Sequence, residues 1–229
     1  MPTDPIIVAL DYDEAEQALQ LVSQIKDYLR FFKVGSQLFT REGPLFIRRL
    51  REHGVEVFLD LKFHDIPETV RKAVRAAAAL DVRFLTIHTS GGPAMIEAAL
   101  KGAEGTRTTV LGVTVLTSMD EASLRATGQT RTPSEQVLFL AEMAQKAGLR
   151  GLVCSPLEIT PIREQLGKDL LLVTPGIRGT GDRQGDQKRT LSAEEALRLG
   201  ANHLVIGRPI TEAPDPVAVA KTLAAIQAP

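Results

Sequence analysis

The chain has 229 residues, 44% hydrophobic and 24% charged, which is enough to bury a large core in one domain. Its 27 basic and 28 acidic residues leave a net charge of −1, so neither nucleic acid nor an anionic membrane is indicated as a partner. A single cysteine excludes an intrachain disulfide, no apolar run is long enough to cross a bilayer, and Met1–Pro5 lacks the basic start of a signal peptide. We therefore expect a cytoplasmic protein.

Strands and helices are expected to alternate from the first residues onward. Short apolar runs rich in β-favouring residues predict strands, and apolar residues at helical spacing predict helices. Asp13 is the expected N-cap of the first helix, with Glu16 three residues later. In the first half of the chain we expect strands at 6–10, 31–35, 55–62 and 82–87, and helices at 13–29, 43–53, 67–80 and 93–102.

The same alternation continues to the end of the chain. Strands are expected at 108–116, 152–154, 170–173 and 203–206, and helices at 120–126, 133–146, 156–166, 192–199 and 215–226. Eight strand–helix units in a chain near the ~250 residues typical of the fold predict an α/β protein with one domain over 1–229, a (β/α)8 TIM barrel. Doubly wound sheets share the alternation but rarely need eight units.

The stretch from Phe58 to Ile66 carries the strongest chemical signal. Asp60 and Lys62 are two residues apart, so on a strand they point to the same face. Asp65 follows where the strand should end, because Pro67 cannot donate to a ladder. Paired charges of both signs stabilise each other's ionised forms, which suits a positioned proton donor. A structural salt-bridge cluster is the alternative interpretation of this stretch.

Polar residues also end most of the other predicted strands. In (β/α)8 barrels the active site forms at these ends. The strand-end residues are Asp11, Lys33, Asp60, Lys62, His88, Thr117, Ser118, Ser155, Pro175, Gly176, Gly207 and Arg208. Two Asp and two Lys from three successive strands predict an active site, because burying charges is costly and needs a compensating role.

The last two strands predict a phosphate site. Barrels of this kind often bind phosphate after strands seven and eight, where the sequence has Pro175-Gly-Ile-Arg178 and Gly207-Arg208. Gly207 lets a backbone N–H approach an oxyanion, and Arg208 is a bidentate donor. The polar segment 179–190 is predicted to be a lid over this site, with a disordered loop as the alternative. No histidine spacing indicates a metal site.

The sequence around Asp60 and Lys62 resembles the signature of a known enzyme family. Asp60-Leu-Lys62-Phe-His-Asp65-Ile66-Pro67 is similar to the D-x-K-x-x-D-I-P signature of orotidine 5′-monophosphate (OMP) decarboxylases. The resemblance extends over nearly the whole chain, through Ala9-Leu-Asp11, Phe32-Lys33-Val-Gly35, Thr114-Val-Leu-Thr117-Ser118, Pro175-Gly-Ile-Arg178, Gln187 and Val205-Ile-Gly-Arg208. It implies a cofactor-free (β/α)8 homodimer that makes UMP from OMP, the last step of de novo pyrimidine nucleotide biosynthesis.

The resemblance also implies catalytic roles. Lys62 would protonate C6 of the pyrimidine as CO2 leaves. Asp60 would lie beside the substrate carboxylate and, with Lys33, fix Lys62. Asp65 would join this array from the other subunit, with Ile66 and Thr69 nearby.

Substrate contacts follow from the same resemblance. Asp11 and Lys33 would bind ribose hydroxyls. Either Thr117 or Ser118 would contact the pyrimidine. The remaining substrate-binding residues are Pro175, Arg178, Gln187, Gly207 and Arg208, of which Gln187, Arg208 and the Gly207 backbone would hold the phosphate.

Two other functions stay open. An Mg²⁺-dependent sugar-phosphate decarboxylase or aldolase of the same barrel superfamily would share the D-x-K-x-x-D spacing, but it would be sensitive to EDTA. A non-catalytic nucleotide-binding barrel would bind UMP and release no CO2, yet it would not need the array of Asp60, Lys62 and Asp65.

Overall fold

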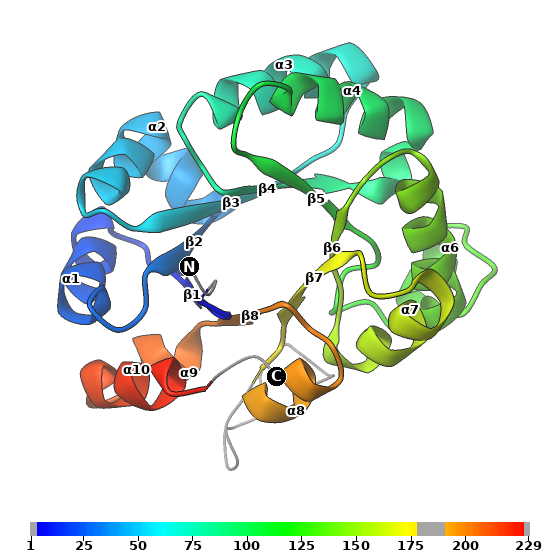
Figure 1. The fold of residues 1–229 in the computed structure, drawn as a ribbon. Coiled ribbons are helices and arrows are strands. Elements are labelled where there is room, and N and C mark those ends of the chain that lie inside the picture. The colour runs from blue at the N-terminus through cyan, green and yellow to red at the C-terminus, as the bar shows by residue number, and fades with distance from the viewer. Residues whose placement is uncertain (1–3, 178–190, 227–229) are drawn as a thin grey trace.

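The computed structural model describes residues 4–177 and 191–226, in which eight parallel strands close into a barrel in sequence order (Figure 1). The ring closes where β1 pairs with β8, with Ile6 opposite Leu204. The predicted single-domain (β/α)8 barrel is therefore confirmed. The strands are β1 (Ile6–Ala9), β2 (Phe31–Gly35), β3 (Glu56–Phe63), β4 (Phe84–His88), β5 (Thr109–Val113), β6 (Gly151–Val153), β7 (Leu171–Pro175) and β8 (His203–Ile206). The predicted lid at 179–190 lies outside the described residues.

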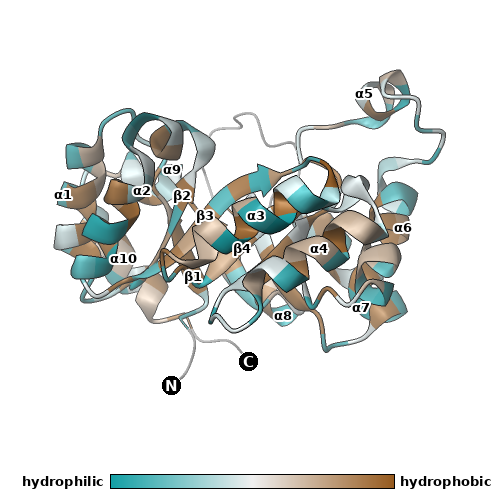
Figure 2. Cartoon of the chain, turned by 90° about the horizontal axis from the view of Figure 1, so that it is seen from above, coloured by the Kyte–Doolittle hydropathy of each residue, from teal (hydrophilic) through white to brown (hydrophobic). Residues whose placement is uncertain are grey.

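Helices surround the barrel and turn their apolar sides toward it. They are α1 (Ala15–Ile25), α2 (Ser36–Glu52), α3 (Pro67–Ala78), α4 (Pro93–Ala103), α5 (Glu121–Ala126), α6 (Pro133–Lys146), α7 (Ile159–Leu166), α8 (Ala193–Arg198), α9 (Arg208–Thr211) and α10 (Pro216–Ala224), with 3-10 turns η1 (Thr89–Gly91) and η2 (Pro156–Glu158). Figure 2 shows α5 standing away from the body of the barrel. No helix within the described ranges is long and apolar enough to cross a membrane.

The core has two layers because strand residues alternate between the two faces of the sheet. Ile6 and Val8 point outward and pack under the helices, whereas Ile7 and Ala9 point into the barrel. The interior cluster consists of Ile7, Ala9, Phe31, Phe58, Phe84, Leu111, Val173 and Val205. These side chains fill the lower barrel, so the polar residues at the carboxyl ends of the strands lie above an apolar plug.

Two local predictions are wrong. Helix α2 begins at Ser36 rather than at 43, because the chain bends at Gly43 (φ 68°, ψ −164°) and Pro44 restarts the helix. Only glycine adopts such a positive φ readily, so Gly43 marks a kink and not a boundary. Asp13 does not cap α1: the N-cap is Glu14, without a side-chain hydrogen bond, and the Asp13 carboxylate instead accepts a hydrogen bond from the Gln37 amide.

Candidate active site

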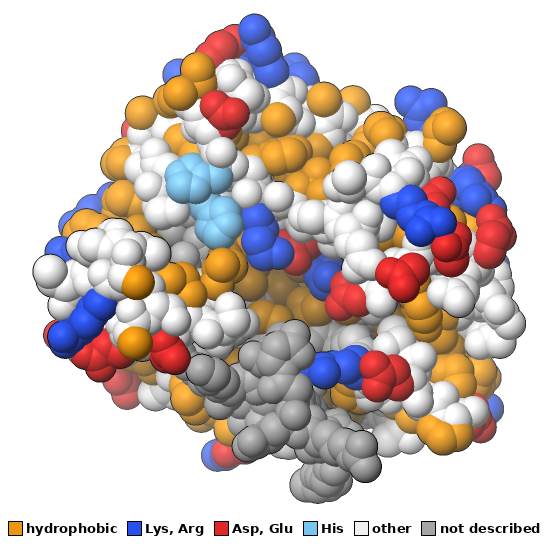
Figure 3. Space-filling model, turned by 180° about the vertical axis from the view of Figure 1, so that it is seen from behind, with side chains coloured by type: hydrophobic (Ala, Val, Ile, Leu, Met, Phe, Trp, Pro, Cys, Tyr) orange, Lys and Arg blue, Asp and Glu red, His pale blue; other side chains and the backbone are white. Residues whose placement is uncertain are grey.

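The mouth of the barrel holds a cavity of about 480 Å³, a size suited to a small-molecule ligand. Figure 3 shows acidic and basic side chains next to each other in the hollow of this face. The cavity is lined by Ala9, Asp11, Lys33, Phe58, Asp60, Lys62, Val113, Val115, Leu116, Thr117, Val153, Pro175, Gly176, Ile177, Val205, Gly207, Arg208, Pro209 and Glu212. Residues from seven of the eight strands, all except β4, therefore meet at one site, where the sequence placed the strand ends.

Charges of alternating sign run across one wall of this cavity. Lys33 Nζ lies 2.9 Å from Asp11 Oδ1 and 4.0 Å from Asp60 Oδ2. Lys62 Nζ lies 2.8 Å from the same Asp60 oxygen. The order Asp11, Lys33, Asp60, Lys62 places each charge beside one of opposite sign. Such an array holds an ammonium in a fixed position at the cavity surface.

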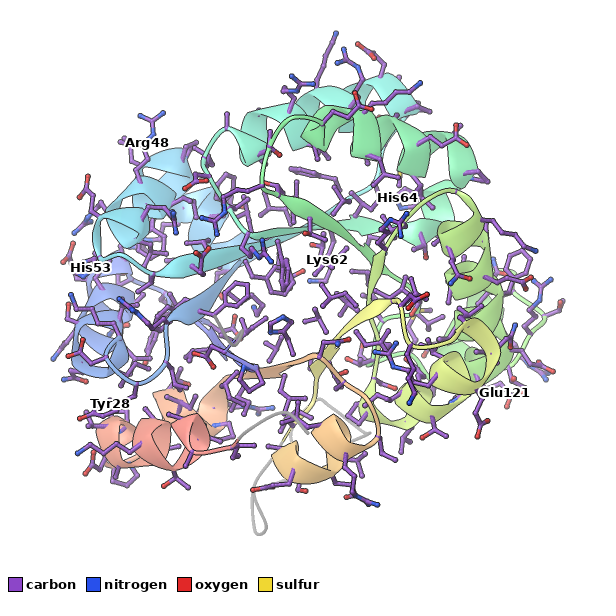
Figure 4. The ribbon with its side chains drawn as sticks, in the orientation of Figure 1. Tyr28, Arg48, His53, Lys62, His64 and Glu121 are labelled. Carbon is purple, nitrogen blue, oxygen red and sulfur yellow. The ribbon has the colours of Figure 1, made fainter. Side chains whose placement is uncertain are left out.

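The burial of these side chains differs in a way that matters for chemistry. The side chains of Lys33 and Asp60 are only 12% and 13% exposed, whereas that of Lys62 is 34% exposed. Figure 4 shows Lys62 inside the ring of strands, while Tyr28, Arg48 and Glu121 lie at the periphery. Lys62 is thus the more exposed of the two lysines, and the nearly buried Lys33 and Asp60 connect it to Asp11 at the other, open end of the array.

A bulge in β3 brings Asp60 and Lys62 to this position. Leu59 pairs with Leu85 and Phe63 pairs with Ile87, so the residues 60–62 lie opposite a single residue of β4. Lys62 has a φ of 51°, an unusual backbone conformation for a residue other than glycine. Simple strand alternation predicted that both side chains face the same way, but the structure achieves it with an irregular strand.

A pair of histidines lies next to the array. The rings of His64 and His88 are 5.6 Å apart, and neither lines the cavity. Burial lowers the pKa of His88, with further lowering from His64 and Lys62, while Asp60 acts in the opposite direction. This lowering favours the neutral form of His88, so it adds no further positive charge beside Lys62.

Three apolar residues of the cavity lining were not recognised as site residues from the sequence. Val113 and Val153 end β5 and β6, Val205 is the second-last residue of β8, and all three line the cavity. Alternate residues of each strand point into the barrel, so the sequence could have indicated these three. Choosing the correct alternate set requires the exact strand bounds, which the sequence does not give. They add apolar surface to a cavity that the array lines with charge.

The predicted phosphate end lies in the same cavity. Pro175, Gly207 and Arg208 all line it. A Cβ at position 207 would lie 3.4 Å from the Ala9 Cβ and 3.7 Å from Asp11 Oδ2, so a side chain there would enter the mouth. Two further predicted contacts, Arg178 and Gln187, lie outside the described residues.

The remaining predicted residues separate into two groups. Thr117 lines the cavity, whereas Ser118 is exposed and does not line it, which favours Thr117 as the pyrimidine contact. Asp65, Ile66 and Thr69 are exposed and do not line the cavity of their own chain, and Ile66 is 68% exposed. Asp65 accepts a hydrogen bond from the Ile66 N–H at 2.6 Å.

Comparison with known proteins decides the family. The model of the orotidine 5′-phosphate decarboxylase / HUMPS family matches residues 4–223. The chain belongs to this family. The orotidine 5′-phosphate decarboxylase of Nitrosococcus oceani is 50% identical over 227 residues, 98% of both chains, and that of Actinobacillus succinogenes is 50% identical over 221 residues, 95% of both. The crystal structure of orotidine 5′-phosphate decarboxylase from Lactobacillus acidophilus has a TM-score of 0.86 at 40% identity, covering 96% of this chain and 97% of that one.

Membership of the orotidine 5′-phosphate decarboxylase / HUMPS family confirms the resemblance read from the D-x-K-x-x-D-I-P stretch. The lining of the cavity also agrees with this family. A cavity lined by a charged array, by apolar side chains and by an arginine can hold a phosphorylated heterocycle with a reactive carbon facing Lys62. Among the described residues no group of His, Cys, Asp or Glu is arranged to hold a metal ion.

Proposed function

We propose that this protein decarboxylates OMP to UMP, the last step of de novo pyrimidine nucleotide biosynthesis, in the cytoplasm. The observation that carries the proposal is the alternating array of Asp11, Lys33, Asp60 and Lys62 in the barrel mouth, with the Lys62 ammonium facing the cavity. Relatives of 50% identity over nearly the full chain bear the name of this enzyme.

The chemistry requires a cation beside one carbon atom. When the bond from C6 to the carboxylate carbon breaks, CO2 leaves and the electron pair stays on C6. Lys62 Nζ donates a proton to this carbon, forming the C6–H bond of UMP, and regains a proton from solvent. A positive charge held in place beforehand stabilises the developing carbanion without reorganisation during the reaction.

The supporting residues keep this cation oriented. Asp60 binds Lys62 Nζ at 2.8 Å and lies beside the position of the substrate carboxylate, while Lys33 links Asp60 to Asp11. Asp11 and Lys33 bind the ribose hydroxyls, and Thr117 binds the pyrimidine. Catalysis gains from this rigidity because small misplacements of reacting groups cost rate.

The phosphate lies far from C6 and supplies binding energy. Arg208 and the Gly207 backbone hold it at the cavity edge, with Pro175 beside them. Gln187 and Arg178, together with the segment 179–190, complete this grip as a lid. Binding energy from such a remote group can be used to stabilise the transition state when the lid closes.

The active site is completed by a second copy of the chain. Asp65, with Ile66 and Thr69, is exposed just beyond the carboxyl end of β3, at the start of α3. We infer that in a homodimer this segment reaches the neighbour's cavity, where the Asp65 carboxylate joins the Lys62 array. An exposed Ile66 at this place is expected if a partner covers it.

One assay separates the candidate functions. Purified protein is incubated with OMP in excess EDTA, and the loss of OMP absorbance and the release of CO2 are followed. The proposal predicts turnover that EDTA does not change. Turnover abolished by EDTA and restored by Mg²⁺ would favour a sugar-phosphate type of enzyme, and UMP binding without CO2 release would favour a binding protein.

A further inference from the structure

Thr86 is the residue of β4 that faces the bulge in β3. It lies two residues after Phe84, whose ring fills the barrel interior, so Thr86 points to the same inner side. Its exposed fraction is 0%, and it does not line the cavity. A polar side chain buried at this depth needs hydrogen-bond partners.

The Thr86 hydroxyl has two partners, and both belong to the Asp–Lys array. The backbone N–H of Lys62 donates to Thr86 Oγ1 at 2.9 Å, and Thr86 Oγ1 donates to Asp60 Oδ1 at 2.9 Å. An amide N–H can only donate, and the carboxylate accepts, so the single hydroxyl proton is committed to Asp60.

Together with the Asp60–Lys62 ion pair, these hydrogen bonds link Thr86, Asp60 and Lys62 in a closed loop. Asp60 Oδ1 accepts from Thr86, and Asp60 Oδ2 accepts from Lys62 Nζ at 2.8 Å. Thr86 therefore ties the backbone of Lys62 to the same carboxylate that holds its ammonium. The hydrogen bonds of Thr86 lie where Lys62 has its positive φ of 51° and where the pairing of β3 with β4 is irregular. Such a backbone conformation persists only when the surrounding structure stabilises it, and Thr86 contributes to this stabilisation.

We propose that Thr86 is a positioning residue for the decarboxylation. It sets the plane of the Asp60 carboxylate and the backbone of Lys62, and through them the place of the proton donor. This inference rests on the proposed function. Thr86 does not contact the substrate, so the loss of its hydroxyl should slow the chemical step and leave substrate binding nearly unchanged.

The test replaces Thr86 by valine, which keeps the shape and removes the hydroxyl. For Thr86→Val we expect kcat on OMP to fall about 10- to 100-fold, with the KM for OMP and the Kd for UMP within about threefold of wild type. Thr86→Ser keeps the hydroxyl and should stay within about threefold of wild type in kcat. If the valine variant does not fold, Thr86→Cys, with a weak S–H donor, replaces it and should show a loss in the same direction.

Thr108→Val is the matched control. Thr108 is also a buried threonine of the barrel, and its hydroxyl donates to the Val82 carbonyl at 2.7 Å, away from the array. It should lose stability as Thr86→Val does and keep wild-type kcat.

Two readouts decide the proposal separately from the proposed function. The crystal structure of Thr86→Val should show the Lys62 backbone or its Nζ displaced relative to Asp60; an unchanged arrangement would refute positioning whatever the substrate. Equal kcat for Thr86→Val and Thr108→Val, or a serine variant as slow as the valine variant, would also refute it. A wild-type protein that does not act on OMP would refute the proposed function instead.

Discussion

His203 should make the stability of the barrel depend on pH. Its imidazole is buried in the lower barrel, with its ring 5.7 Å from that of Phe31 and 5.2 Å from that of Phe84. Nδ1 lies 3.1 Å from the carbonyl oxygen of Asp4, so this nitrogen carries the proton of the neutral ring. Burial is the main reason that the pKa of His203 is lowered to about 4; the Asp4 hydrogen bond opposes this effect, and the charge of Arg83 adds a smaller lowering.

The direction of the pH dependence follows from the two pKa values. In the unfolded chain a histidine has a pKa of about 6.5. Between about 6.5 and 4 the unfolded state therefore binds a proton that the native state does not, and the free energy of unfolding falls as the pH falls. At about 1.4 kcal/mol per pKa unit, the loss across this window amounts to about 3 kcal/mol. Above pH 7 the effect of His203 is complete and constant.

Urea unfolding at several pH values from about 7.5 to about 4.5 measures most of this loss of stability. This range covers most of the window between the two pKa values. The variant His203→Asn keeps an amide donor for the Asp4 carbonyl and cannot gain a proton, so its stability should fall less steeply with acid than that of wild type. His53→Asn, at the carboxyl end of α2, is the control and should keep the wild-type slope. If His203→Asn and wild type lose stability in parallel, the buried neutral state of His203 is wrong.

Two further predictions concern the ligand and the partner subunit. Arg208→Ala or Gln187→Ala should lower kcat/KM on OMP by a factor that corresponds to about 2–3 kcal/mol of transition-state stabilisation. Activity on orotidine, which has no phosphate, should stay nearly normal. Equal losses on both substrates would show that these residues do not bind the phosphate. Lys62→Ala and Asp65→Ala homodimers should each be nearly inactive, but in a mixed dimer one site carries both lesions and the other neither. Mixing under subunit exchange should then restore up to half of the wild-type activity per heterodimer, and exchange confirmed by mass without any return of activity would contradict a shared site.

The alternation of strands and helices was readable from the sequence because each element has its own period of apolar residues. The strand at Phe31–Gly35 and the helix at Pro133–Lys146 were predicted with the bounds that the structure has. The first part of α2 was missed because Gly43 and Pro44 usually mark an end, and here they mark a kink within one helix. Such cases depend on packing beyond the local stretch.

The site was predictable at the strand ends and less so inside the barrel. Asp60 and Lys62 were found because charges at the ends of apolar strands stand out. Thr86 was missed, since a threonine in a strand is ordinary and its role depends on the bulge opposite it. The bulge itself has no local sequence signal, because Lys62 takes a positive φ that its residue type disfavours.

The role of Lys62 can be tested against a matched lysine on the surface. Lys146 on α6 has a side chain that is 74% exposed and pairs with Glu142 four residues earlier. Lys146→Ala removes one ammonium without touching the cavity, so it should keep wild-type turnover. It shows what the loss of a lysine does in itself.

The turnover of OMP by Lys62→Ala, measured in excess EDTA beside wild type and Lys146→Ala, tests the central claim most directly. A positioned proton donor contributes about 10²- to 10⁴-fold to a rate, and Lys62 also stabilises the carbanion, so we expect a loss of more than about a hundredfold. A Lys62→Ala protein that folds and retains a tenth of wild-type turnover would contradict the assignment of Lys62 as the group that protonates C6.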